Sequence, residues 1–180
     1  MIITAILVLM AFAVGTWIAA DPVRVAEVRR LIGTPEGLLA LFLINALSSA
    51  TLILPLPGLA LTPLAATVAD PLLVGIIAGS GQTVGELTGY LAGYSGRKAL
   101  GMDARTQRMT NWMRRWGAAL LFVLALIPNP FFDVAGIIAG ATRMPLRLYL
   151  LAAGAGKILK NVALAYGVTL GLGWLLGSSP

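Results

Sequence analysis

Four ionisable residues stand inside long apolar stretches, far from any polar loop: Glu86, Asp133, Lys157 and Lys160. A charged side chain at membrane depth is costly unless it is paired or hydrated, and such residues usually mark a pathway for an ion or a substrate. Because two of the four are acids and two are bases, they can form ion pairs with one another. Sequence alone does not say which base meets which acid.

Polar and small residues share a helical face with Glu86. Their spacing of four, three, four, three and four residues runs through Gly75, Gly79, Gln82, Glu86, Gly89 and Gly93. This is the period of an α-helix, and a stripe of small residues allows another helix to approach closely. In a later segment Asn161 follows Lys157 by four residues and Lys160 follows it by three, so these side chains also share a face.

Two interpretations of these residues are open. In the first, the charges form ion pairs that only hold helices together. In the second, they line a polar groove that admits a lipid headgroup while the acyl chains stay in the bilayer. The predicted lining residues of this groove are Glu86, Asp133, Lys157, Lys160, Gln82, Asn129 and Asn161.

The composition limits the classes of protein that can carry such a site. The 180 residues are 58% hydrophobic and 11% charged, whereas a soluble domain is about 25% charged. Cysteine and histidine are absent, which excludes disulfides, Cys/His metal sites and Ser-His-Asp triads. We therefore predict a membrane protein that is not an enzyme and has no catalytic residues, metal or cofactor. The net charge of +6 lies mostly beside apolar segments, which is typical of membrane orientation and argues against nucleic-acid binding.

The apolar segments predict an all-α integral membrane protein with a single domain. We expect transmembrane helices at 1–20, 71–96 and 145–177, and the first lacks the basic start of a signal peptide. The segments 37–69 and 117–141 are broken internally, and the predicted tips are Pro55, Pro57 and Gly58 in the first and Pro128 and Pro130 in the second. Each arm of 117–141 has about 11 residues and reaches about 16 Å, half of a hydrocarbon core of about 30 Å. In 37–69 the returning arm 59–69 is equally short, whereas the arm 37–54 is long enough to span. These segments are therefore predicted to be re-entrant hairpins; the alternative is that they span.

The two halves of the chain form an internal repeat of hairpin followed by long helix. Setting Gly81 on Gly156 aligns Gln82 with Lys157 and Glu86 with Asn161. Inverted repeats with broken helices build midplane sites in many transporters. If both hairpins return to their side of entry, 96–116 and 142–147 share one side. That side has one acid, Asp103, and eight basic residues: Arg97, Lys98, Arg105, Arg108, Arg114, Arg115, Arg143 and Arg147. The positive-inside rule makes it cytosolic.

The segment 97–116 is predicted to be an amphipathic helix on the cytosolic membrane surface. Trp112, Met113 and Trp116 recur at helical spacing. The predicted headgroup contacts are Arg97, Arg105, Arg108 and Arg115. A plain charged loop is the alternative.

Three stretches of the sequence resemble the DedA/VTT membrane protein family. They are "GQTVGELTGYLAGYSGR" (81–97), "IPNPFFDVAGIIAG" (127–140) and "GAGKILKNVALAY" (154–166), and the likeness covers about residues 50–170. It is closest to the vacuole membrane protein 1 branch. The resemblance implies two facing re-entrant hairpins and movement of lipids between leaflets. Bacterial members have tip arginines and an acid after the first Pro-Gly; this chain has Ala125, Phe131 and Leu59 there, which favours ordinary phospholipids over polyprenyl phosphate.

The function expected from these observations is passive phospholipid scrambling in the cytoplasmic (inner) membrane. The partners would be membrane phospholipids, and self-association into a homo-oligomer is left open. One alternative is a proton- or ion-coupled transporter of a lipid phosphate or small solute, with Glu86 or Asp133 as the proton carrier. Another is a structural or assembly protein in which the charges only pack helices.

Overall fold

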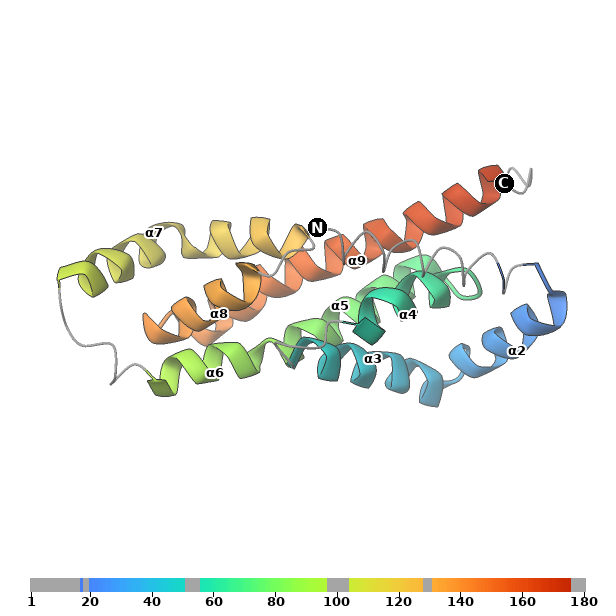
Figure 1. Cartoon of the computed structure of the whole chain (residues 1–180), viewed down its shortest axis with the longest axis horizontal. Coiled ribbons are helices and arrows are strands. Elements are labelled where there is room, and N and C mark those ends of the chain that lie inside the picture. The colour runs from blue at the N-terminus through green and yellow to red at the C-terminus, as the bar shows by residue number, and fades with distance from the viewer. Residues whose placement is uncertain (1–16, 18–19, 51–55, 97–103, 128–130, 176–180) are drawn as a thin grey trace.

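The computed structural model describes residues 17, 20–50, 56–96, 104–127 and 131–175, and every regular element in these ranges is an α-helix (Figure 1). The helices are α2 (Pro22–Ile32), α3 (Pro35–Ala50), α4 (Leu56–Ala66), α5 (Pro71–Gly85), α6 (Leu87–Gly96), α7 (Ala104–Leu126), α8 (Phe131–Ala141) and α9 (Leu146–Leu175). The prediction of an all-helical fold is confirmed for this part of the chain. The helix predicted at 1–20 falls almost entirely outside the described residues.

Aspartate and proline together fix where two of the helices begin. The Asp21 carboxylate accepts a hydrogen bond from the Val23 N–H at 2.9 Å, and the Asp70 carboxylate accepts one from the Leu73 N–H at 2.8 Å. Proline follows each aspartate, where its missing N–H costs nothing. These residues therefore set the first turns of α2 and α5.

Helices α3 and α4 fold back on each other, and so do α7 and α8. In Figure 1, α3 and α7 both end in the middle of the molecule, where α4 and α8 begin, and each second arm returns to the end from which its first arm came. The connecting tips lie outside the described residues, with Pro55, Pro128, Asn129 and Pro130. We predicted the first break at 55–58, but α4 already begins at Leu56, because proline at residue 57 is tolerated in a first turn.

Helix α7 is longer than the sequence suggested. We predicted a surface helix over 97–116 and a separate hairpin arm from residue 117, but one helix of 23 residues covers both from Ala104 to Leu126. No proline occurs in this range, so nothing interrupts the backbone hydrogen bonds where the composition changes from basic to apolar. From residue 104 onward the charged-loop alternative is wrong.

The predicted helix over 71–96 is interrupted at a single residue, Glu86. Its φ and ψ are −66° and −12°, and it separates α5 from α6. The Tyr90 N–H donates to the Glu86 carbonyl oxygen at a long 3.3 Å, and the Tyr149 hydroxyl donates to the same oxygen at 3.1 Å. A carbonyl that serves a second donor loosens the helix at this point.

Helix α9 is the long helix of the second half. Among the described residues, Leu146–Gly171 is the stretch long and apolar enough to cross a membrane by itself. Helices α2 and α3 pass the same test only as a pair, and they are bent by 83°. Helix α9 packs against α5 in its later part and against α7 in its earlier part (Figure 1).

Two apolar clusters lie along the long helices. The first joins α3, α4, α5 and the later part of α9, through Leu41, Ala65, Ala66, Val74 and Ala165. The second joins α6, α7, α8 and the start of α9, through Tyr90, Leu121, Ala125, Phe132, Ala135, Ala139, Met144, Tyr149 and Ala153. Each cluster therefore contains residues from both arms of one helix pair, α3 with α4 or α7 with α8.

Candidate functional site

The polar residues predicted from the sequence lie between the two apolar clusters. Along α5 and α6, Gln82 and Glu86 stand between Val74 of the first cluster and Tyr90 of the second. Along α9, Lys157 and Asn161 stand between Ala153 and Ala165. The two polar stretches meet where α5 crosses α9, so the sequence positions them at the junction of the clusters.

Glu86 and Lys157 form a buried ion pair. The Lys157 Nζ donates to Glu86 Oε1 at 2.6 Å, and the two residues are only 6% and 5% exposed. The Lys157 ammonium also lies 4.6 Å from the centroid of the Phe132 ring, on α8. A pair so far from solvent is held by this short contact and by the ring, and removing either charge leaves the other without compensation.

Gln82 connects three helices through its side-chain amide. Its Oε1 accepts hydrogen bonds from Lys160 Nζ at 3.1 Å and from Asn161 Nδ2 at 3.0 Å, both on α9. Its Nε2 donates to Asn45 Oδ1 on α3 at 2.9 Å and to Asn161 Oδ1 at 3.3 Å. The amide thus has both its donor and its acceptor groups used inside the bundle.

Asn45 and Thr62 belong to this network but were missed in the sequence. Asn45 is fully buried; its Nδ2 donates to the Leu41 carbonyl at 2.9 Å, and the Thr62 hydroxyl on α4 lies 3.5 Å from its Oδ1. The sequence does contain a signal for Asn45, because this residue has the one amide side chain within the apolar arm 37–54. The same rule that selected Glu86, a polar group at membrane depth, also selects Asn45.

Asp133 lies at the edge of the network. It is half-buried on α8, where Lys157 attracts its carboxyl group and the Glu86 carboxyl group repels it. Of the predicted groove residues, the structure brings together Gln82, Glu86, Asp133, Lys157, Lys160 and Asn161. Asn129 lies outside the described residues.

Glycines bring α5 and α9 close enough for these contacts. A Cβ atom on Gly75 would lie 2.6 Å from Val162 Cα, and one on Gly79 would lie 2.5 Å from Ile158 Cα. Both distances are too short for any side chain, so the backbones touch at these positions. The part of the predicted small-residue stripe on α5 therefore faces α9 directly, whereas its part on α6 faces α8, where a Cβ on Gly93 would collide with the Ile137 carbonyl.

Gly81 and Gly156, which the repeat places at equivalent positions, have equivalent neighbours. A Cβ on Gly81 would collide with the Phe42 carbonyl of α3, and one on Gly156 would lie 2.6 Å from the Phe122 carbonyl of α7. In both halves the glycine thus receives the first arm of its own hairpin.

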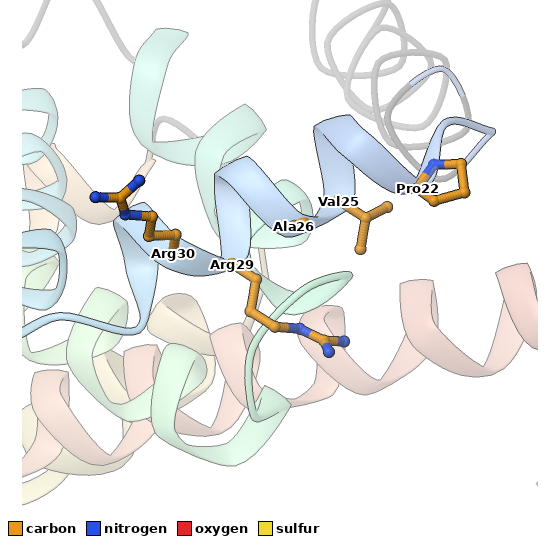
Figure 2. A pocket seen from close by; sticks show the side chains of 5 residues that line it. All are labelled: Pro22, Val25, Ala26, Arg29 and Arg30. Atoms are coloured by element: carbon orange, nitrogen blue, oxygen red, sulfur yellow. The ribbon is translucent and has the colours of Figure 1, made fainter.

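The network is packed rather than open. Buried polar groups satisfy one another, and the described residues contain no group of carboxylates able to hold a metal ion. A shallow pocket lies elsewhere, on α2, lined by Pro22, Val25, Ala26, Arg29 and Arg30. Figure 2 shows the Arg29 and Arg30 side chains pointing apart, and Arg29 Nε donates to the Val68 carbonyl at 3.1 Å. Since the two guanidinium groups do not converge, the network remains the candidate site.

The predicted headgroup contacts are partly described. Arg108 and Arg115 are exposed on α7, while Arg97 and the Arg105 side chain lie outside what the structure describes. Arg114, which directly precedes Arg115 on α7, is exposed as well.

Apolar helices with a polar interior define a helical membrane protein. The VTT domain family model matches residues 56–170, more than half of the 180 residues. The chain belongs to this family, the domain of the DedA membrane proteins, as its sequence motifs suggested. The comparisons with curated proteins and with solved structures gave no match. The vacuole membrane protein 1 branch stays a prediction.

Proposed function

We propose that the protein is a passive carrier, and not an enzyme, that moves phospholipids between the two leaflets of a membrane. The observation that carries this proposal is the buried network around Glu86, Gln82 and Lys157, enclosed by apolar helices where both hairpins meet the long helices. A phospholipid has the same two parts: its polar headgroup suits the network, and its apolar tails suit the surrounding helices. Family membership supports the proposal, since these proteins are membrane proteins regarded as transporters or flippases.

The hairpins in this proposal are re-entrant and related by an inverted repeat. Helices α4 and α8 have 11 residues each, so each reaches about 16 Å, half of the hydrocarbon thickness. Both hairpins return to the end from which they start (Figure 1). The matching surroundings of Gly81 and Gly156 support the repeat.

The orientation follows from the basic residues at one end of the molecule. Helix α6 ends, α7 begins, α8 ends and α9 begins at this end (Figure 1). The exposed basic residues of these elements are Arg108, Arg114 and Arg115 in the first half of α7, and Arg143 and Arg147 around the connection of α8 to α9. In the proposal this end is cytosolic, and the membrane is the cytoplasmic (inner) membrane.

The observed arrangement is the closed form of the path. Lys157 is neutralised by Glu86, so a phosphate group passing through exchanges with the Glu86 carboxylate as the partner of Lys157. The amides of Gln82, Asn45 and Asn161 can both donate and accept, and they therefore serve headgroups of different chemistry. This predicts low selectivity among phospholipids.

The test is lipid exchange in liposomes that contain the purified protein and a fluorescent phospholipid. A reductant added outside bleaches only the outer leaflet unless lipids cross, so scrambling makes the whole signal accessible. We expect Glu86→Gln to slow the exchange more than tenfold and the control Glu27→Gln, on the exposed face of α2, to leave it unchanged. Exchange no faster than in empty liposomes would refute the proposal.

A coupled transporter is the second candidate, and one contact favours it. Asp133 and Glu86 bring two carboxyl groups close to Lys157, and like charges that share a site favour a proton on one of them. A proton shared there could be released as a substrate passes. This candidate predicts that a pH gradient across the liposome membrane drives net movement of lipid; a rate independent of the gradient excludes it.

A further inference from the structure

Helix α7 carries an exposed stripe whose chemistry changes along its length. Residues four or seven apart on this face are Arg108, Trp112, Trp116, Val123 and Ile127, and the last four are 49%, 54%, 50% and 54% exposed. The stripe thus passes from a guanidinium group to indole rings and then to aliphatic side chains. These side-chain types match the successive layers of a membrane, from the headgroups through the interface to the hydrocarbon core.

The opposite face of α7 is fixed by packing, so the stripe is directed away from the bundle. Met113, Leu121 and Ala125 are 3%, 0% and 2% exposed. The backbone around Phe122 receives Gly156 of α9 in direct contact. In the described part of the chain, the stripe therefore faces what surrounds the protein.

The distance along α7 agrees with an oblique or upright entry into the bilayer. Trp116 and Ile127 are 11 residues apart, which is about 16 Å along a helix and about half of the hydrocarbon thickness. If Trp116 lies at the interface, the end of α7 lies near the midplane. A helix lying flat on the surface would place Val123 and Ile127 among headgroups.

The basic end of α7 carries a positive charge, which attracts anionic lipids. The helix contains four arginines, Arg105, Arg108, Arg114 and Arg115, and no acidic residue. Each arginine near an anionic leaflet is worth about 1 kcal/mol. The Arg115 guanidinium lies 5.8 Å from the Trp116 ring centroid, so charge and indole share the same surface.

We propose that the surface formed by Arg108, Trp112, Arg115 and Trp116 binds the headgroups of anionic phospholipids and sets the depth of the second hairpin. This deepens the proposed function, because depth decides where the hairpin tip meets the path. Its occupant is the anionic headgroup layer itself, matched by charge and by the interfacial preference of tryptophan. The readout below does not involve lipid exchange, so the two proposals fail independently.

The test uses tryptophan fluorescence in liposomes of phosphatidylcholine and phosphatidylglycerol. In a Trp17→Phe/Trp174→Phe background the emission comes from Trp112 and Trp116 alone. We expect spin-labelled phosphatidylglycerol to quench it at least about twofold more than spin-labelled phosphatidylcholine, given the attraction per arginine. Replacing Arg108 and Arg115 by Gln removes the preference, and replacing them by Lys keeps it. Equal quenching by both lipids in the parent protein would overturn the proposal.

A second measurement tests the depth. A tryptophan introduced by Val123→Trp, with the four native tryptophans replaced by Phe, is compared with Trp116 alone, using lipids labelled at shallow and deep positions. We expect the tryptophan at residue 123 to be quenched most by the deep label and Trp116 by the shallow label. The same depth for both residues would mean that α7 lies flat, and it would refute the assignment of the stripe.

Discussion

The ion pair between Glu86 and Lys157 gives the sharpest test of the site. Unit charges 2.6 Å apart attract by about 6 kcal/mol at an effective dielectric constant of 20, and desolvation offsets much of this. Removing one partner of a buried pair costs about 3–5 kcal/mol. We expect Lys157→Met to cost about 4 kcal/mol and Glu86→Gln about 3, because Gln can still accept a hydrogen bond and the Phe132 ring still faces Lys157.

The double variant shows whether Glu86 and Lys157 stabilise the protein through their mutual interaction or independently of each other. With both charges removed, nothing is left uncompensated, so the double variant should cost about 3 kcal/mol rather than the sum of about 7. The coupling energy is then about 4 kcal/mol. Reversible unfolding by dodecyl sulfate in mixed micelles, followed by far-UV circular dichroism, measures the free energy of unfolding. It is applied to the parent protein, both single variants and the double variant, with Glu27→Gln as control. A double variant as unstable as the sum of the singles would show that the pair does not contribute as a pair.

Three further predictions use the same unfolding measurement. Gly93→Ala should destabilise by about 1–3 kcal/mol because a Cβ there collides with the Ile137 carbonyl, whereas Gly96→Ala, with open space around it, should change stability by less than about 0.5 kcal/mol. Equal effects at both glycines would contradict this packing. Arg143→Gly should stabilise by about 0.5–1 kcal/mol, because Arg143 adopts a left-handed φ of 55°; a loss of stability would mean that its side chain matters more than its backbone. Asn45→Leu should cost about 2 kcal/mol, since Gln82 loses its partner on α3, and a neutral effect would remove Asn45 from the network.

Proline and helical periodicity predicted most of the fold. The starts of α5 and α9 follow from Pro71 and Pro145, and the glycine stripe through Gly75 and Gly79 does face another helix. The sequence does not predict the continuity of α7, because the change from basic to apolar residues resembles the end of an element. Composition reports the surroundings of a helix and does not by itself end it.

The charged members of the site were also predictable, because ionisable residues at membrane depth stand out. The partner of Glu86 was not: Lys157 and Lys160 lie on one face, and only the crossing of α5 and α9 decides that Lys157 reaches the carboxylate while Lys160 reaches Gln82. The interruption at Glu86 has no signal in the local sequence. It accompanies a hydrogen bond from Tyr149, 63 residues away, and local propensity does not report such tertiary contacts.

The interruption at Glu86 has a mechanical consequence. Helix α5 is packed with the first apolar cluster and α6 with the second, so in the described chain the two clusters are joined by unbroken α9 and by the single loosened residue between α5 and α6. A rotation of one cluster against the other bends the chain at Glu86. The same rotation changes the distance between the Glu86 carboxylate and Lys157, which is anchored in α9. Glu86 is thus both the point of interruption between α5 and α6 and one half of the buried ion pair with Lys157, so a rotation at this point also strains the pair.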